Sequence, residues 1–164
     1  MAISSVVKNF RDGTLLFEDG TGTPLTLTVQ YEEGNFSLSG LQEGLTEINT
    51  YLDRGVLGTV RKTNASFPTF SFNAYLTDIS DGTDATLPDL VLKSGSFASA
   101  VSTLGANADV MTYKLTWTIE GTNFGDSADH TCVLNDCHIM IDMSEGDPDT
   151  FSVSGTVFGT ITLT

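Results

Sequence analysis

The chain has 164 residues, of which 40% are hydrophobic and only 17% are charged, and its 21 acidic and 7 basic side chains give a net charge of −14. A chain of this length fits one domain (1–164), and its negative charge excludes general affinity for nucleic acid backbones, because phosphates are repelled. The chain is rich in Thr, Ser and Gly in place of charged residues, and this composition favours β-sheet over disorder.

The N-terminal third predicts short strands and one long projection. Apolar residues at 15 and 17, a turn cluster and the alternating residues 25–31 predict a hairpin, and a further strand starts at Phe36. Residues 41–68 are the least regular part of the chain. We expect them to form a long hairpin or extended loop that projects from the body, because connections of this length without their own core tend to be functional or ordered by a partner.

The middle of the chain predicts strand, helix and strand. Residues 70–76 alternate as a strand does, and residues 87–95 begin with Pro and Asp near the first turn, as a helix does. Residues 97–104 either extend that helix or form a loop. The clearest strand is 111–119, whose apolar face includes Trp117 and should be central to the core.

The C-terminal third reads as strands and turns. A strand at 131–134, a turn at Asn135–Asp136, a strand at 137–143 and a turn at 145–149 lead to alternating residues 151–163. The charge-free run at the end is either covered by a partner or a plain core strand. These patterns predict a mainly β fold, a β-sandwich or partly closed barrel with one short flanking α-helix and the long projection.

The charge is unevenly distributed. Residues 115–164 contain eight acids and no Lys or Arg, whereas three of the seven bases lie within nine residues, at Arg54, Arg61 and Lys62. We expect one basic patch on an otherwise acidic body, which suits contacts between copies of the chain. The partners expected for these bases are Glu145, Asp147 and Asp149.

No metal, cofactor or catalytic site is expected. His130, Cys132, Cys137 and His138 lack the ligand spacing of zinc sites, so buried reduced thiols with surface histidines are the favoured interpretation. The acids between 78 and 89 do not match an EF-hand loop, although an irregular calcium site there or at Asp147 and Asp149 stays open.

The catalytic motifs of common enzymes are also missing from the sequence. It has no nucleophile elbow, P-loop or dinucleotide fingerprint, and pairs among 21 carboxylates have almost no specificity as a glycosidase signal. The first eight residues lack the pattern of a signal peptide, and no apolar run is long enough to cross a bilayer. We therefore expect a protein that folds in the cytoplasm without a membrane partner.

Five segments, in order along nearly the whole chain, resemble the tail tube (major tail) proteins of long-tailed bacteriophages. They comprise the 13–24 hairpin, 33–36, the 52–55 turn, the 70–76 strand before an acidic loop and short helix, and the closing 145–155 segment. The resemblance implies a structural virion subunit without catalysis or cofactor, assembled in the host cytoplasm. It also implies homo-hexameric rings that stack into a hollow tube, and other tail proteins as partners: tape measure, terminator and baseplate.

The acidity agrees with this resemblance. A conduit for DNA should not bind DNA, and a lumen lined with carboxylates would repel it over a Debye length of about 8 to 10 Å. The alternative is a carbohydrate- or receptor-binding β-sandwich module, which would need exposed aromatic residues, yet Trp117 is expected in the core.

Overall fold

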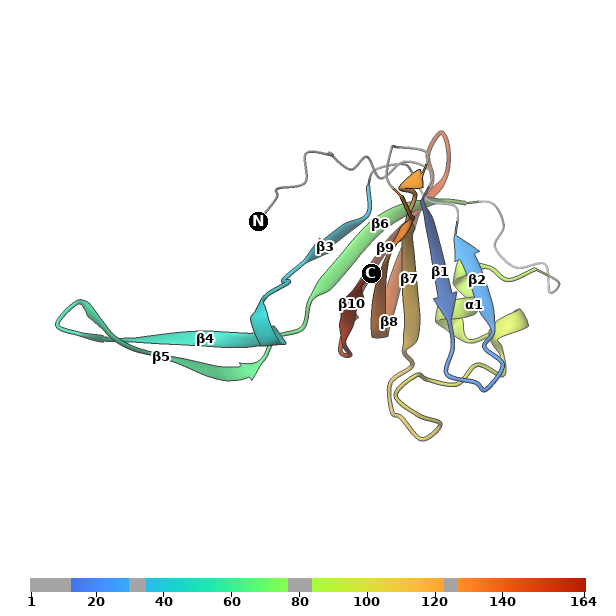
Figure 1. Ribbon diagram of the computed structural model, residues 1–164. Coiled ribbons are helices and arrows are strands. Elements are labelled where there is room, and N and C mark those ends of the chain that lie inside the picture. The colour runs from blue at the N-terminus through green and yellow to red at the C-terminus, as the bar shows by residue number, and fades with distance from the viewer. Residues whose placement is uncertain (1–12, 30–34, 77–83, 123–126) are drawn as a thin grey trace.

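The computed structural model describes residues 13–29, 35–76, 84–122 and 127–164. Eight strands form one antiparallel sheet in the order β2-β1-β7-β8-β9-β6-β3, with β10 pairing with β8 (Figure 1). Its strands are β1 (Thr14–Glu18), β2 (Thr26–Val29), β3 (Ser37–Ser39), β6 (Thr69–Tyr75), β7 (Tyr113–Ile119), β8 (His130–Ser144), β9 (Thr150–Val157) and β10 (Ile161–Leu163).

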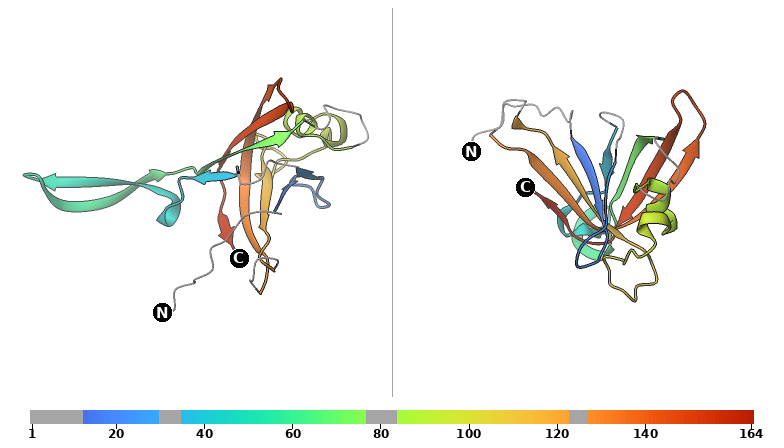
Figure 2. Two further views of the ribbon diagram at one scale, coloured as in Figure 1. Left: turned by 90° about the horizontal axis from the view of Figure 1, so that it is seen from above. Right: turned by 90° about the vertical axis from the view of Figure 1, so that its right-hand side faces the viewer.

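The sheet curls so that its two halves face each other without closing into a barrel (Figure 2). Phe17 of β1 lies 6.4 Å, centroid to centroid, from Phe72 of β6, although three strands separate β1 from β6 in the sheet. Phe36 and Trp117 pack 4.5 Å apart in the same way. The mainly β fold predicted from the sequence is confirmed, and Trp117 packs against the core as expected.

One short α-helix flanks the sheet, as predicted. It is α1 (Leu87–Leu92), whose N-cap Thr86 accepts a hydrogen bond from the backbone N–H of Asp89 at 3.2 Å. The following residues do not extend the helix: a 3₁₀ turn, η2 (Gly95–Phe97), is followed by a long connection to β7. None of the described helices is long and apolar enough to cross a membrane.

The predicted turn at Asn135–Asp136 is wrong, because β8 continues through it. Asp136 adopts a left-handed conformation (φ 54°), which inserts one extra residue opposite β7 and makes a bulge. The partner strand breaks at the same level: Asn135 N–H donates to Thr160 O at 3.0 Å, and Gly159 N–H donates to Asn135 O at 3.1 Å. Thus β9 and β10 are one strand path interrupted where β8 bulges.

The charge-free end is mostly a core strand. In β9, Phe151, Val153 and Val157 are buried at alternate positions, whereas Leu163 in β10 is 67% exposed. The core-strand interpretation therefore holds for β9.

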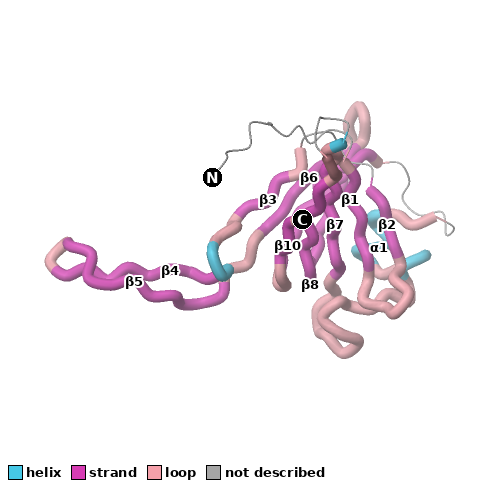
Figure 3. The backbone as a smooth tube through the Cα atoms, in the orientation of Figure 1, coloured by secondary structure: helices cyan, strands magenta, loops and turns pink. Residues whose placement is uncertain are grey.

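The projection predicted for 41–68 is a two-stranded hairpin (Figures 1 and 3). A 3₁₀ turn, η1 (Glu43–Leu45), precedes β4 (Thr46–Asp53) and β5 (Val56–Ala65). These two strands form a separate sheet that extends beyond the ends of β3 and β6. We call residues 46–65 the arm.

Candidate functional site

The arm ends in a tight turn and carries no buried core. Arg54 (φ 50°) and Gly55 (φ 83°) occupy the turn, and positive φ at both positions is typical of the two-residue hairpin turn that follows the twist of its strands. Nearly every arm residue is exposed, and within the described chain β4 and β5 pair only with each other. An isolated two-stranded hairpin is at best marginally stable in water, so the arm gains stability from any partner that covers it.

The two faces of the arm differ in polarity. Cross-strand pairs share a face, so the register assigns each side chain to one side. One face, the apolar face, comprises the pairs Ile48–Lys62, Thr50–Val60 and Leu52–Leu57. The opposite face comprises Asn49–Arg61, Tyr51–Thr59 and Asp53–Val56. On the apolar face Leu52 is 63% exposed and Leu57 59%. Contiguous exposed apolar side chains of this kind mark interaction surfaces.

The three predicted basic residues share the arm but not a face. Arg54 lies at the tip, Arg61 on the more polar face, and Lys62 on the apolar face near the root. There the Lys62 Nζ lies 3.7 Å from a carboxylate oxygen of Glu43, with both side chains exposed, so this ion pair contributes little. The arm contains two acids and three bases and so carries a charge of +1, whereas the rest of the chain carries −15.

The three predicted acidic partners lie at the end of β6 and β9 that is opposite the arm. Glu145, Asp147 and Asp149 belong to the exposed loop between β8 and β9, which we call the acidic loop, and Asp149 accepts a hydrogen bond from Gly146 N–H at 2.7 Å. Tyr75 of β6 pairs with Thr150, next to this loop, whereas Thr69 begins β6 on the side of the arm. One copy therefore does not bring its arm bases and its acidic loop together.

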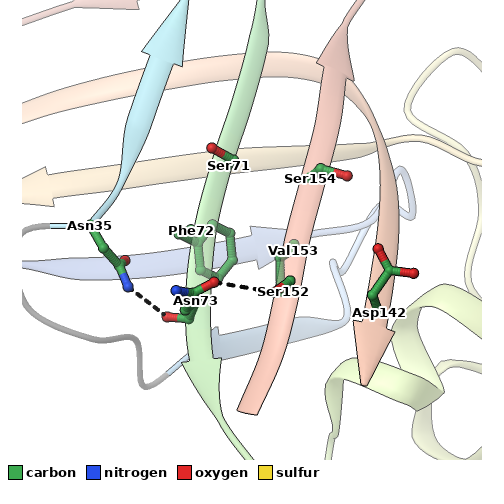
Figure 4. A pocket seen from close by; sticks show the side chains of 8 residues that line it. All are labelled: Asn35, Ser71, Phe72, Asn73, Asp142, Ser152, Val153 and Ser154. Atoms are coloured by element: carbon green, nitrogen blue, oxygen red, sulfur yellow. Dashed lines mark hydrogen bonds between the residues drawn. The ribbon is translucent and has the colours of Figure 1, made fainter. Parts of the chain in front are cut away.

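A hydroxyl-lined groove follows the outer face of β6 and β9, between the acidic loop and the root of the arm. It consists of two adjoining hollows of about 240 and 230 Å³ that share Ser71 and Ser154. Figure 4 shows the hollow nearer the acidic loop, with Asn73 accepting a hydrogen bond from Ser152 Oγ at 3.3 Å. Asp142 is the only charged residue among the described residues that line the groove. The sequence signal for this groove was the Ser and Thr alternation in 69–75 and 150–156, which we interpreted only as strand.

Carboxylates are rare on the strands. In the described strands of the main sheet they occur at Glu18, Asp136 and Asp142, and Glu18 pairs with Lys114 at 2.7 Å. Most of the outward positions carry Ser or Thr instead. An acidic surface therefore has to come chiefly from the connecting loops, not from a wall of strands.

Two solved assemblies contain chains with this fold. One is an extracellular contractile injection system, the PVC sheath–tube complex in its extended state: the TM-score is 0.54 at 9% identity over 99% of this chain and 93% of that chain. The other is the anti-feeding prophage (AFP) baseplate, solved with six-fold symmetry, with a TM-score of 0.50 at 9% identity over 100% and 97% of the two chains. No family model and no curated protein matches the sequence. The likeness extends over the whole length of the chain and shows a common fold.

Both cysteines point to the core side of β8, and His138, next to Cys137, points to the other side. Cys132 and Cys137 are both buried although five positions separate them, because the bulge at Asp136 restores their common direction. The ring Nδ1 of His138 lies 3.2 Å from the backbone oxygen of Met111. The described residues contain no group of three or more His, Cys, Asp and Glu side chains that could hold a metal ion.

The buried thiols should be unreactive in the folded protein. Burial raises the pKa of the Cys137 thiol to about 12 and also raises the pKa of Cys132. We expect a thiol reagent at pH 8 to modify neither residue until the protein unfolds, because only about one Cys137 in ten thousand is then a thiolate. Mass spectrometry after iodoacetamide treatment, with and without urea, measures this. Rapid alkylation without urea would contradict it.

The candidate calcium ligands between 78 and 89 are only partly within the described residues. Asp78 and Asp81 lie outside the described residues. Asp89 is fully buried and accepts hydrogen bonds from Thr86 Oγ1 at 2.8 Å and from Ser94 Oγ at 3.0 Å, so its carboxylate stabilises the start of α1.

Proposed function

We propose that this chain is the structural subunit of a phage-type tail tube, and that it forms homo-hexameric rings that stack into a hollow conduit for DNA. The observation that carries the proposal is the likeness in fold, over 99% of the chain, to a chain of a sheath–tube complex. Six-fold symmetry in the second assembly agrees with a hexameric ring. The arm supports assembly, because it exposes neighbouring apolar side chains, and such patches are usually interaction sites.

In this proposal the protein acts by shape and charge, without catalysis or a cofactor. DNA passes without specific binding, because a chain with a net charge of −14 repels phosphate. The strands contribute mostly hydroxyls, so carboxylates in the loops at the strand ends supply the acidity of the lumen. The subunit resides in the virion tail after assembly in the host cytoplasm, with tape measure, terminator and baseplate proteins as its further partners.

Contacts between copies join the arm bases to the acidic loop. The sequence predicts Arg54, Arg61 and Lys62 on one side and Glu145, Asp147 and Asp149 of a neighbouring copy on the other. Because Arg54 lies at the tip of the arm, we propose that Arg61 and Lys62 near its root are the bases that meet the acidic loop. The separation of these bases from the acidic loop within one copy favours a heterologous contact, in which different patches of two copies meet and the contact repeats around a ring or along a stack.

Negative-stain electron microscopy of the purified protein tests the function. We expect rings or tubes at high protein concentration, and no shift of a DNA fragment in a gel at physiological salt. A protein that stays monomeric at every concentration would contradict the proposal.

Reversing one arm charge should weaken assembly. We expect Arg61→Glu to raise the protein concentration needed for polymerisation by about tenfold or more, because it places a carboxylate near the acidic loop of the next copy. Sedimentation measures the effect, and an unchanged circular dichroism spectrum shows that the fold is intact. Unchanged polymerisation would remove Arg61 from the contact.

A carbohydrate- or receptor-binding module remains the second candidate because of the groove. Asn35, Asn73 and Asp142 present amide and carboxylate groups there, as sugar sites do. The groove lacks an exposed aromatic ring among its described lining residues, which favours the tube. A monomer that binds an immobilised glycan, with binding lost in Asn73→Ala, would favour this second candidate.

A further inference from the structure

Within residues 13–29, 35–76, 84–122 and 127–164, no helix or strand outside the arm packs on the apolar face of the arm. The arm is attached where β3 ends and β6 begins, and it extends away from the body (Figures 1 and 2). Val60 is 49% exposed and Ile48 53%, in addition to Leu52 and Leu57. These exposed side chains leave room for another molecule to cover the face.

The hydroxyl-lined groove has the properties that such a cover requires. Its lining consists largely of small side chains, with Met140, 55% exposed, as a larger apolar contact. It is an almost uncharged strip on a body that carries −15, so an arm lying in it would bury one carboxylate and not several. Asp142 is that carboxylate, and Lys62 is the single charged residue among the paired residues of the apolar face.

We propose that the apolar face of the arm packs into the groove of a second copy of this chain, with Lys62 facing Asp142 across the contact. The two sheets then stack as layers about 10 Å apart, as sheets in proteins do. The ten residues of β5 span about 33 Å and the seven of β6 about 23 Å, so the arm is long enough to cover the groove. The inference rests on the proposed assembly of copies and specifies its contact surface.

The direction of the arm agrees with this pairing. The arm leaves the body at the Thr69 end of β6, and the acidic loop lies at the opposite end of β6. If a second copy is displaced along the arm, its acidic-loop end therefore lies beside the root of the first copy's arm, where Lys62 lies. Asp142 belongs to that end, because Asp142 pairs with Ser152 near the acidic loop. The same displacement repeats from copy to copy and builds an open stack.

Disulfide cross-linking tests the contact directly. We expect a protein with Val60→Cys and Ser154→Cys to form disulfide-linked oligomers when assembled and oxidised, because Val60 is the next apolar-face residue after Lys62 and Ser154 is the next groove residue after Ser152, which pairs with Asp142. The matched control is Tyr51→Cys with Ser154→Cys, since Tyr51 is equally exposed on the opposite face. Both native cysteines are buried, so we expect them to stay unreactive in this experiment.

The cross-linking outcomes separate the possible occupants. Linkage through 60 and 154 but not through 51 and 154 supports the proposal. Dimers of a protein that carries Val60→Cys alone would instead show arm packing against arm. Either that result, or assembled particles without linkage between 60 and 154, overturns the groove contact.

A charge exchange tests the Lys62–Asp142 pair. We expect Lys62→Glu and Asp142→Lys each to raise the concentration needed for assembly by about tenfold or more, and the double variant to restore it to within about threefold of the original. Tubes that form normally in both single variants would overturn the pairing while leaving the tube function intact. A wild-type chain that never assembles would overturn both.

Discussion

Replacing Gly155 with alanine is expected to lower the free energy of unfolding by about 3 kcal/mol or more. Gly155 of β9 lies directly opposite Phe70 of β6, and its missing side chain leaves room for the phenyl ring. An added Cβ would collide with that ring and lie 2.6 Å from the backbone oxygen of His138. The oxygen belongs to the neighbouring strand and cannot move without breaking the ladder. Urea denaturation followed by tryptophan fluorescence measures the change.

A matched control is Gly22→Ala. Gly22 lies in the turn after β1, and nothing lies within 4 Å of the position its Cβ would take, so its stability should change by less than about 0.5 kcal/mol. The double variant Gly155→Ala with Phe70→Leu should recover only part of the loss, because the contact with His138 remains. A Gly155→Ala protein as stable as the Gly22→Ala control would show that the sheet relaxes at this point.

Strands and their buried faces could be predicted because local alternation determines them. Residues 70–76 alternate apolar and polar side chains, and β6 buries Phe70, Phe72 and Ala74 as that pattern requires. The start of α1 could also be predicted from the sequence, because Pro88 and Asp89 favour a helix N-terminus through contacts within its first turn.

Features that depend on the partner strand could not be predicted. Asn and Asp tolerate positive φ, and for that reason Asn135–Asp136 has the composition of a turn. The same tolerance also allows a β-bulge, which forms here because the neighbouring strand breaks at the same level. The faces of the arm likewise depend on register. One extra residue in β5, between Leu57 and Thr59, puts Leu57 and Lys62 on the same face although five positions separate them.

The acidity of the chain shows the same limit. The carboxylate count predicted an acidic body, and the resemblance implied a lumen lined with carboxylates, but the count does not distinguish loops from outward strand positions. The structure assigns most outward strand positions to Ser and Thr, which leaves the groove nearly neutral. A nearly neutral strip on a strongly acidic body allows two copies to approach closely where the rest of their surfaces repel.

Removing the carboxylate of Asp19 should destabilise the fold by about 3 kcal/mol at pH 7. Asp19, only 4% exposed, follows β1 and accepts hydrogen bonds from Val101 N–H at 2.9 Å and Leu25 N–H at 2.8 Å. It thereby attaches the β1–β2 turn to the long connection before β7. Asp19→Ala leaves these two part-buried N–H groups without their acceptor. Asp19→Asn should also lose stability, because its amide would place a donor against a donor on one side.

The loss should depend on pH in a defined direction. Burial raises the pKa of Asp19, but the hydrogen bonds from Val101, Thr21 and Leu25 together outweigh burial and hold the pKa below its ordinary value of 3.8. A folded-state pKa below the unfolded one means that the carboxylate stabilises the fold above about pH 4. That contribution disappears as pH falls through the folded-state pKa. The stability difference between wild type and Asp19→Asn should therefore be constant from pH 5 to 7 and shrink in stronger acid.

Urea denaturation of both proteins between pH 2.5 and 7 measures this dependence. Asp109→Asn, in an exposed loop, is the control for the loss of one negative charge and should leave stability within about 0.5 kcal/mol of wild type. An Asp19→Asn protein as stable as this control at pH 7 would show that the turn holds without the carboxylate. A difference that stayed constant down to pH 2.5 would attribute the loss to packing and not to the ionised group.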